Sequence, residues 1–354
     1  MEEKKPSIPN FGIVADKRYL EHETGAHVES PRRLRVIYDM LERELIMDKV
    51  LSISPRYASE EEVAMNHAPE YIRMLKNFGA GYLDADTVLS GRSYDTALLA
   101  VGGSLNMVDA IYGDHISRGF ALVRPPGHHA EYNKSMGFCL FNNTAIAARH
   151  ILQKYGLKRI AIFDWDLHHG NGTEHSFYDK SEVLYISIHQ SPCYPGTGRL
   201  SDVGEGDGEG FNVNIPLPAG AGDKEYIQLT NDFVVPIISE YSPDIIFVSA
   251  GFDTHISDPL GGMNVTASGF GEMSRLIFSL ADNICRSKAA FFLEGGYSLD
   301  GLGSSVKKVI QTAVSGSSDT YRPKDSGINI DVLMEKTAEI QRKYWNILGN
   351  YSGG

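Results

Sequence analysis

Four short segments of the chain carry acidic, histidine or tyrosine side chains directly after an apolar run. They read RPPGHHAE (residues 124–131), DWDLHHGNG (164–172), SAGFD (249–253) and EGGYSL (294–299). Carboxylates and imidazoles bind divalent metal ions and transfer protons, and a tyrosine hydroxyl can donate a hydrogen bond to a developing oxyanion. The four segments are therefore candidates for one catalytic site built around a metal ion.

The metal ligands are expected to be Asp166, His168 and Asp253. Asp166 and His168 alternate along an extended stretch, which points both side chains to the same side, and Asp253 follows another apolar run. One histidine with two carboxylates and an open position is typical of catalytic zinc rather than structural zinc; iron(II) suits the same ligands. Alternatively, DWDLH is a turn whose aspartates accept from backbone donors. The adjacent His128 and His129 favour the metal site.

His128 and His129 are candidates for proton transfer. They follow a Pro-Pro-Gly turn that restricts the backbone, and a histidine titrates near neutral pH. Asp164 and Asn171 are available to orient their second ring nitrogens. Tyr297 follows two glycines, which allow a sharp turn toward the metal. The alternative for the histidine pair is two hydrogen-bonded core residues without a catalytic role.

The elements that must position these residues are predicted from the apolar pattern. Nearly continuous apolar runs are typical of buried strands in a parallel sheet, and helical patterns lie between them. The alternation predicts an α/β fold, one domain over residues 1–354 with an open parallel sheet, whose strand ends gather the four segments. The predicted strands are residues 120–123, 159–163, 183–188, 245–248 and 289–293; the predicted helices are 31–44, 94–112, 142–155, 224–241 and 266–286, with a C-terminal helical extension over 331–348.

Composition limits the classes of partner. Lys and Arg total 33 against 45 Asp and Glu, a net charge of −12, so nucleic-acid binding is not expected. An acidic surface suits a cationic partner such as a basic protein tail or a polyamine, although it also serves solubility alone. No apolar run is long enough for a membrane span. The three cysteines are widely spaced, which favours a reducing compartment, and we expect a cytoplasmic protein.

The motifs together resemble those of the histone deacetylase family, which includes bacterial relatives and acetylpolyamine amidohydrolases. The resemblance runs from about residue 12 to about residue 314 and follows the family's order. It implies the family's three-layer fold, which is shared with arginase. The matching motifs are HVESPRRL (27–34), RPPGHHA (124–130), GFCLFNN (137–143), FDWDLHHGNGT (163–173), PGTG (195–198), SAGFD (249–253), DPLGG (258–262) and EGGY (294–297).

The resemblance also implies a role for each matching residue. Asp166, His168 and Asp253 match the zinc ligands, and Tyr297 matches the transition-state donor. His129 matches the general base and acid, with His128 as its electrostatic neighbour. The remaining matches are Phe138 and Tyr194 (aromatic walls of the acyl-lysine tunnel), Gly137 (acceptor of the amide N–H), Asp164 and Ser187 (a structural potassium site), Arg33 (acetate exit) and Asp86 (grip on the substrate backbone).

Two residues depart from parts of the family. Asn171 stands where nuclear-type members have Asp and class II-type members have Asn, so His129 lacks a full carboxylate partner and we expect its pKa to be lowered. Leu260 stands where polyamine-selective eukaryotic members have Glu. Since leucine cannot attract a second substrate ammonium, Leu260 favours acyl-lysine over acetylpolyamine.

The expected function is a zinc-dependent deacetylase that hydrolyses the acetyl amide of an acyl-lysine, as a monomer or a homo-oligomer. An acetylpolyamine amidohydrolase is the first alternative. An arginase-like ureohydrolase needs two manganese ions and a further carboxylate soon after Asp253, where this chain has His255. A non-catalytic acyl-lysine reader is disfavoured because every catalytic position is filled.

Overall fold

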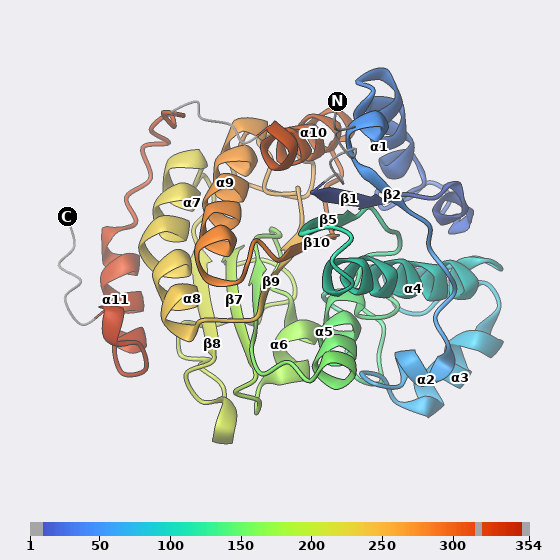
Figure 1. Cartoon of the computed structure of the whole chain (residues 1–354), viewed down its shortest axis with the longest axis horizontal. Coiled ribbons are helices and arrows are strands. Elements are labelled where there is room, and N and C mark those ends of the chain that lie inside the picture. The colour runs from blue at the N-terminus through green and yellow to red at the C-terminus, as the bar shows by residue number, and fades with distance from the viewer. Residues whose placement is uncertain (1–9, 316–320, 349–354) are drawn as a thin grey trace, which may run out of the picture.

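Eight parallel strands form one sheet in the order β2-β1-β5-β10-β9-β6-β7-β8 in the computed structural model, which describes residues 10–315 and 321–348 (Figure 1). The central strands are buried along their whole length. Their nearly continuous apolar sequences explain this burial, because helices cover both faces of the sheet. The strands are β1 (Phe11–Val14), β2 (Leu51–Ile53), β5 (Arg118–Ala121), β6 (Ile160–Asp164), β7 (Val183–Gln190), β8 (Asn212–Leu217), β9 (Ile245–Ala250) and β10 (Ala289–Leu293).

Two layers of helices enclose the sheet. Helices α1, α10, α9, α7 and α8 pack in sequence along one face, and α4, α5 and α6 lie on the other (Figure 1). The result is a single-domain three-layer α/β fold, which confirms the predicted fold class. The helices of the two layers are α1 (Arg32–Arg43), α4 (Ser93–Tyr112), α5 (Asn143–Tyr155), α6 (Asn171–Phe177), α7 (Asp223–Leu229), α8 (Val235–Tyr241), α9 (Ala267–Ile284) and α10 (Leu299–Ser315).

Smaller elements surround these layers. A two-stranded antiparallel ribbon, β3 (Gly81–Tyr82) with β4 (Val88–Leu89), follows the short helices α2 (Glu60–Val63) and α3 (Pro69–Phe78). At the other end of the sheet, α11 (Asp331–Gln341) lies beside the edge strand β8, and Trp345 packs edge-on against Phe211. The C-terminal helical segment therefore packs on the body of the domain.

The predicted strands are confirmed, with one shift. The run at 120–123 is apolar throughout, but β5 pairs as Arg118–Ala121, and Leu122 and Val123 continue as buried chain toward the site. An apolar run reports burial and not strand pairing, which explains the shift. The prediction missed β1, β2 and β8. The predicted helix over 224–241 contains a π-helical turn, Thr230–Val234, between α7 and α8.

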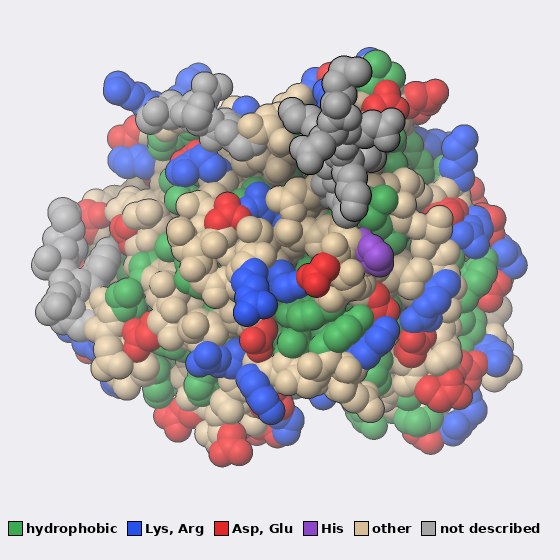
Figure 2. Space-filling model, in the orientation of Figure 1, with side chains coloured by type: hydrophobic (Ala, Val, Ile, Leu, Met, Phe, Trp, Pro, Cys, Tyr) green, Lys and Arg blue, Asp and Glu red, His purple; other side chains and the backbone are tan. Residues whose placement is uncertain are grey.

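Helix length, surface charge and cysteine state bear on the expectations drawn from composition. Within the described residues, no helix is both long and apolar enough to cross a membrane. On the face seen in Figure 2, acidic and basic side chains are intermingled, so neither sign of charge dominates that face. All three cysteines are free thiols, at Cys139, Cys193 and Cys285.

A buried ionic cluster ties the start of α1 to the site edge of the sheet. The Glu29 carboxylate is fully buried and accepts from both Arg124 Nη2 (2.8 Å) and Arg33 Nη1 (3.0 Å). Arg33 also donates to the backbone oxygens of Glu294 and Gly296, in the loop after β10. Burial opposes ionisation of Glu29, but the charge of Arg124 outweighs it and keeps the pKa of Glu29 below its ordinary value.

We expect Glu29→Gln to destabilise the fold by about 3–5 kcal/mol, because it leaves two buried guanidinium groups without their carboxylate. Because the pKa of Glu29 is lowered on folding, its contribution is present above about pH 4.5 and is lost as the pH falls. Urea unfolding of the purified chain measures the change. Glu70→Gln, at an exposed ion pair with Arg73, is the matched control and should cost less than about 1 kcal/mol. Equal costs for the two substitutions would contradict this interpretation.

Candidate active site

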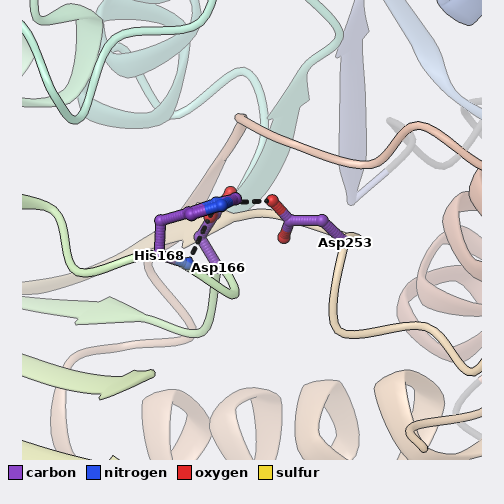
Figure 3. A group of neighbouring side chains, drawn as sticks. All are labelled: Asp166, His168 and Asp253. Carbon is purple, nitrogen blue, oxygen red and sulfur yellow. Dashed lines mark hydrogen bonds and ion pairs between the residues drawn. The ribbon is translucent and has the colours of Figure 1, made fainter. Parts of the chain in front are cut away.

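Asp166, His168 and Asp253 converge beyond the carboxyl ends of β6 and β9. His168 Nδ1 lies 3.2 Å from Asp166 Oδ1 and 3.1 Å from Asp253 Oδ2, and Figure 3 shows the His168 ring beside both carboxylates, with a dashed line from the ring to Asp253. Within residues 10–315 and 321–348, this is the one group of three or more His, Cys, Asp or Glu side chains found with its ligand atoms within 4.8 Å of one another. The predicted ligands are thus brought together.

The other carboxylate oxygens of this group are held by backbone donors. Leu167 N donates to Asp253 Oδ1 at 2.9 Å, and Gly295 N donates to Asp166 Oδ2 at 2.8 Å. These bonds fix the direction of the oxygens that face His168, as the outer contacts of a metal site do. Burial, together with repulsion by Asp166, raises the pKa of Asp253 to about 7. Two carboxylates confined in this way favour a bound cation.

Glycine is required for the close approach of the strand ends. A Cβ at Gly251 would lie 2.0 Å from Asp166 Oδ2, and a Cβ at Gly295 would lie 2.3 Å from Asp253 Oδ2. No side chain fits at either position without moving a carboxylate. The glycines of SAGFD and EGGY therefore leave room for the Asp166–His168–Asp253 group, as well as turning the chain.

The two histidines of the turn after β5 stack with ring centroids 4.0 Å apart. His128 Nδ1 lies 3.1 Å from Asp164 Oδ2, and His129 Nδ1 lies 2.8 Å from Asn171 Oδ1. Asp164 and Asn171, the two residues that the sequence offered to orient the histidines, thus each contact one of them. Since the amide oxygen of Asn171 can only accept, the Nδ1 of His129 carries a proton and its Nε2 keeps a free lone pair.

The environments separate the pKa values of the two histidines. Burial opposes protonation of His128, but the charges of Asp166 and Asp164 outweigh it and raise its pKa to about 10. Burial, followed by the charges of His128 and His168, places the pKa of His129 well below its ordinary value. The lowered pKa has the expected direction, with burial as its main cause. Such a separated pair divides electrostatic and base roles between neighbours.

Tyr297 sits on the loop after β10, with its ring 5.0 Å from the Arg33 guanidinium carbon and 5.7 Å from the Phe138 ring centroid. Burial raises the pKa of its hydroxyl well above the ordinary value, so the phenol stays protonated and able to donate. Asp258 Oδ2 accepts from the backbone nitrogens of Tyr297 (2.6 Å) and Ser298 (3.0 Å). This carboxylate and Arg33 fix the loop.

The two predicted aromatic walls border the catalytic groups. The Tyr194 ring lies 5.1 Å from His129 and 6.1 Å from His168, edge-on in both cases. Phe138 has a positive φ of 69°, which is costly for a bulky residue and typical of functional positions. A Cβ at the preceding Gly137 would lie 2.3 Å from His129 Cδ2. This segment therefore lies in close contact with the His129 ring.

Other predicted residues lie around this centre. Asp86 is half-buried on the loop before β4, where Thr87 Oγ1 accepts from Phe138 N at 3.3 Å. Leu260 is 38% exposed, and its backbone N–H donates to the same Asp258 that holds Tyr297. Asp164 and Ser187 are paired residues of β6 and β7.

Sequence reasoning missed the positioning roles of Glu294 and Asp258. Glu294 is fully buried, and its Oε2 accepts from the backbone nitrogens of Gly127 (2.6 Å) and His128 (3.1 Å). It thereby fixes the histidine turn, and burial raises its pKa to about 7. Both acids stand inside the quoted motifs EGGY and DPLGG, so an acidic residue beside a glycine turn was the available signal.

An open parallel sheet with buried carboxylates and histidines beyond its strand ends defines an α/β enzyme that acts at that edge. The profile of the histone deacetylase domain matches residues 27–313. A probable deacetylase of Archaeoglobus fulgidus is 38% identical, covering 94% of this chain and 98% of the relative. The chain belongs to the histone deacetylase family and is an amidohydrolase.

Further comparisons agree with this assignment. Histone deacetylase 14 of Arabidopsis thaliana, described as chloroplastic, is 38% identical over 86% of this chain and 78% of the relative. Histone deacetylase HDA1 of Candida albicans is 37% identical, and the alignment covers 46% of that longer relative. The crystal structure of the HDA15 HD domain matches with a TM-score of 0.88 and 36% identity, covering 97% of each chain.

We expect Gly251→Ala to weaken divalent-metal binding about 10- to 100-fold, because the added methyl group displaces Asp166, and disturbed ligand positions cost about this much. Dialysis against zinc buffers followed by elemental analysis measures the change. Gly91→Ala is the matched control, since a Cβ there meets nothing within 4 Å. Unchanged affinity in Gly251→Ala would show that the close approach is not needed for binding.

Proposed function

We propose that the chain is a zinc-dependent deacetylase that hydrolyses the acetyl amide of an acyl-lysine side chain to acetate and the free amine. The observation that carries the proposal is the meeting of three groups at one sheet edge. These are the Asp166–His168–Asp253 cluster, the paired histidines with separated pKa values, and a protonated Tyr297. Together they provide a metal site, a base and an oxyanion donor.

The donor set fits zinc. One imidazole nitrogen and two carboxylate oxygens converge in a buried site, with backbone donors on the outer oxygens. Zinc accepts such nitrogen and oxygen ligands and keeps a fourth position for water or substrate in catalytic sites. When bound, it supplies a Lewis acid that polarises an amide carbonyl and lowers the pKa of a water molecule. Iron(II) accepts the same donors.

The chain's own residues carry the protons. His129 Nε2 takes a proton from the attacking water as the new carbon–oxygen bond forms, while Tyr297 donates to the carbonyl oxygen as its negative charge develops. His128, held protonated by Asp164 and Asp166, stabilises that charge. Protonated His129 then delivers its proton to the leaving nitrogen as the carbon–nitrogen bond breaks. Acetate and a free amine result.

The walls of the site favour a slim substrate. Phe138 packs against Tyr297, and Tyr194 packs against His129 and His168. The two rings would enclose an alkyl stem. Gly137 would accept the amide N–H, and Asp86 would hold the substrate backbone. Arg33 would line the exit for acetate. Leu260 provides no charge at the rim, which supports acyl-lysine rather than acetylpolyamine. A structural potassium ion near Asp164 and Ser187 belongs to the same proposal, and the chain would act as a monomer or a homo-oligomer.

The free thiols support a reducing compartment, and we place the enzyme in the cytoplasm on that ground. The alternatives, an arginase-like ureohydrolase and a non-catalytic reader, receive less support. A ureohydrolase would need a further carboxylate near Asp253 for its second metal ion. This chain has His255 there, whose Nδ1 lies 2.8 Å from Ser257 Oγ. Among the described residues, His255 is not part of the Asp166–His168–Asp253 group.

The test is turnover of acetyl-lysine peptides, longer acyl-lysines and acetylated polyamines by the wild-type chain and Tyr297→Phe. We expect the acetyl-lysine peptide to have the highest kcat/KM. Tyr297→Phe should lower kcat about 100- to 1000-fold, the usual effect of removing one oxyanion donor, while bound zinc stays at the wild-type level. Wild-type preference for a polyamine would refute the substrate class, and full activity of Tyr297→Phe would refute the mechanism.

A further inference from the structure

The Asn171 amide contacts His129 of the catalytic pair on one side and Glu131 on the other, and its Nδ2 also lies 3.4 Å from His129 O and 3.3 Å from Met136 Sδ. Its Oδ1 lies 2.8 Å from His129 Nδ1, and its Nδ2 donates to Glu131 Oε1 at 2.5 Å. Asn171 itself is 2% exposed. The Glu131 side chain is 20% exposed, and its two oxygens lie 2.8 and 3.0 Å from His175 Nδ1 at the surface. A continuous chain of polar contacts therefore joins the base to an acidic residue.

The orientation of the Asn171 amide decides which nitrogen of His129 carries its proton. An amide has an accepting oxygen and a donating nitrogen of nearly the same shape, so its two orientations fit one cavity about equally well. With Oδ1 toward His129, the proton stays on Nδ1 and Nε2 is a base. With Nδ2 toward His129, Nδ1 must accept, and the proton moves to Nε2, which can then no longer act as a base.

Glu131 makes the strongest selection between these orientations, because an ionised carboxylate only accepts hydrogen bonds and makes the shortest contact with Nδ2, whereas His129 O and Met136 Sδ are uncharged and more distant acceptors. It fits the Nδ2 end of Asn171 and repels the Oδ1 end. Its own place is fixed by the backbone, since Glu131 O lies 2.9 Å from His67 Nδ1 and Glu131 pairs with Lys134 in an isolated bridge. An aspartate at position 171 would need no such selection, as both of its oxygens accept.

We propose that Glu131 is a positioning residue of the deacetylase reaction, which orients the Asn171 amide and thereby keeps His129 in its basic tautomer. This inference rests on the proposed function for its kinetic consequence and on the contacts alone for its structural one. Glu131 thereby lets Asn171 hold the proton on His129 Nδ1, as an aspartate at position 171 would do without help.

The experiment compares Glu131→Gln in two backgrounds, wild type and Asn171→Asp, in the full zinc-loaded chain. Glutamine keeps the size of the side chain but can donate, so it no longer selects the amide orientation. We expect Glu131→Gln to lower kcat about 10- to 100-fold, the usual effect of losing an outer contact, with KM and bound zinc unchanged. In the Asn171→Asp background the same change should lower kcat less than twofold, or raise it by removing repulsion between two carboxylates.

Glu70→Gln, at an exposed position of α3, is the control for the loss of one negative charge and should match the wild type. A merely structural role for Glu131 would lower activity equally in both backgrounds, which would overturn the inference. Wild-type kcat in Glu131→Gln would overturn it too.

A second measurement does not need turnover. Nitrogen-15 NMR of the His129 ring should show the proton on Nδ1 in the wild type and a substantial Nε2-protonated population in Glu131→Gln. The same Nδ1 tautomer in both proteins would reject the inference, whatever the substrate. Absence of deacetylation by the wild type would reject the proposed function instead, so the two failures are distinguishable.

Discussion

Burial of negative charge at one edge of the sheet is the constraint on which the site depends. Asp164, Asp166, Asp253, Glu294 and Glu29 all have 0% exposure. An isolated carboxylate in such surroundings would take up a proton or require a cation or hydrogen-bond donors. The structure supplies those donors from neighbouring loops, and this need explains why the loops must meet so closely.

Each buried carboxylate is balanced by different partners, and these differences give the neighbouring histidines different charges. Glu29 is balanced by two arginines, and Glu294 by the backbone N–H groups of the histidine turn. The charges of Asp166 and Asp164 raise the pKa of His128, whereas His129 Nδ1 meets the uncharged Asn171 amide. Asp166 and Asp253 share His168 and leave oxygens that a metal ion would satisfy. One acidic edge thus produces a cationic histidine, a neutral histidine and a candidate metal site.

The sequence predicted the parts of this arrangement that follow from residue type and local spacing. Alternation placed Asp166 and His168 on one side, and strand ends placed Asp253 near them, because parallel strands end at a common edge. It could not predict that Asp258 holds the Tyr297 loop or that Glu294 holds the histidine turn, because these contacts join residues up to 167 positions apart. Strands β1 and β2 were missed because four- and three-residue strands carry little pattern of their own.

The central claim is that one metal ion, held by Asp166, His168 and Asp253, activates the site for amide hydrolysis. Its most direct test is to prepare the metal-free chain and titrate zinc while following acetate release from an acetyl-lysine peptide. Activity should rise linearly from near zero and level off at one equivalent of zinc per chain. Full activity without metal, or a break at two equivalents as in a binuclear centre, would contradict the account.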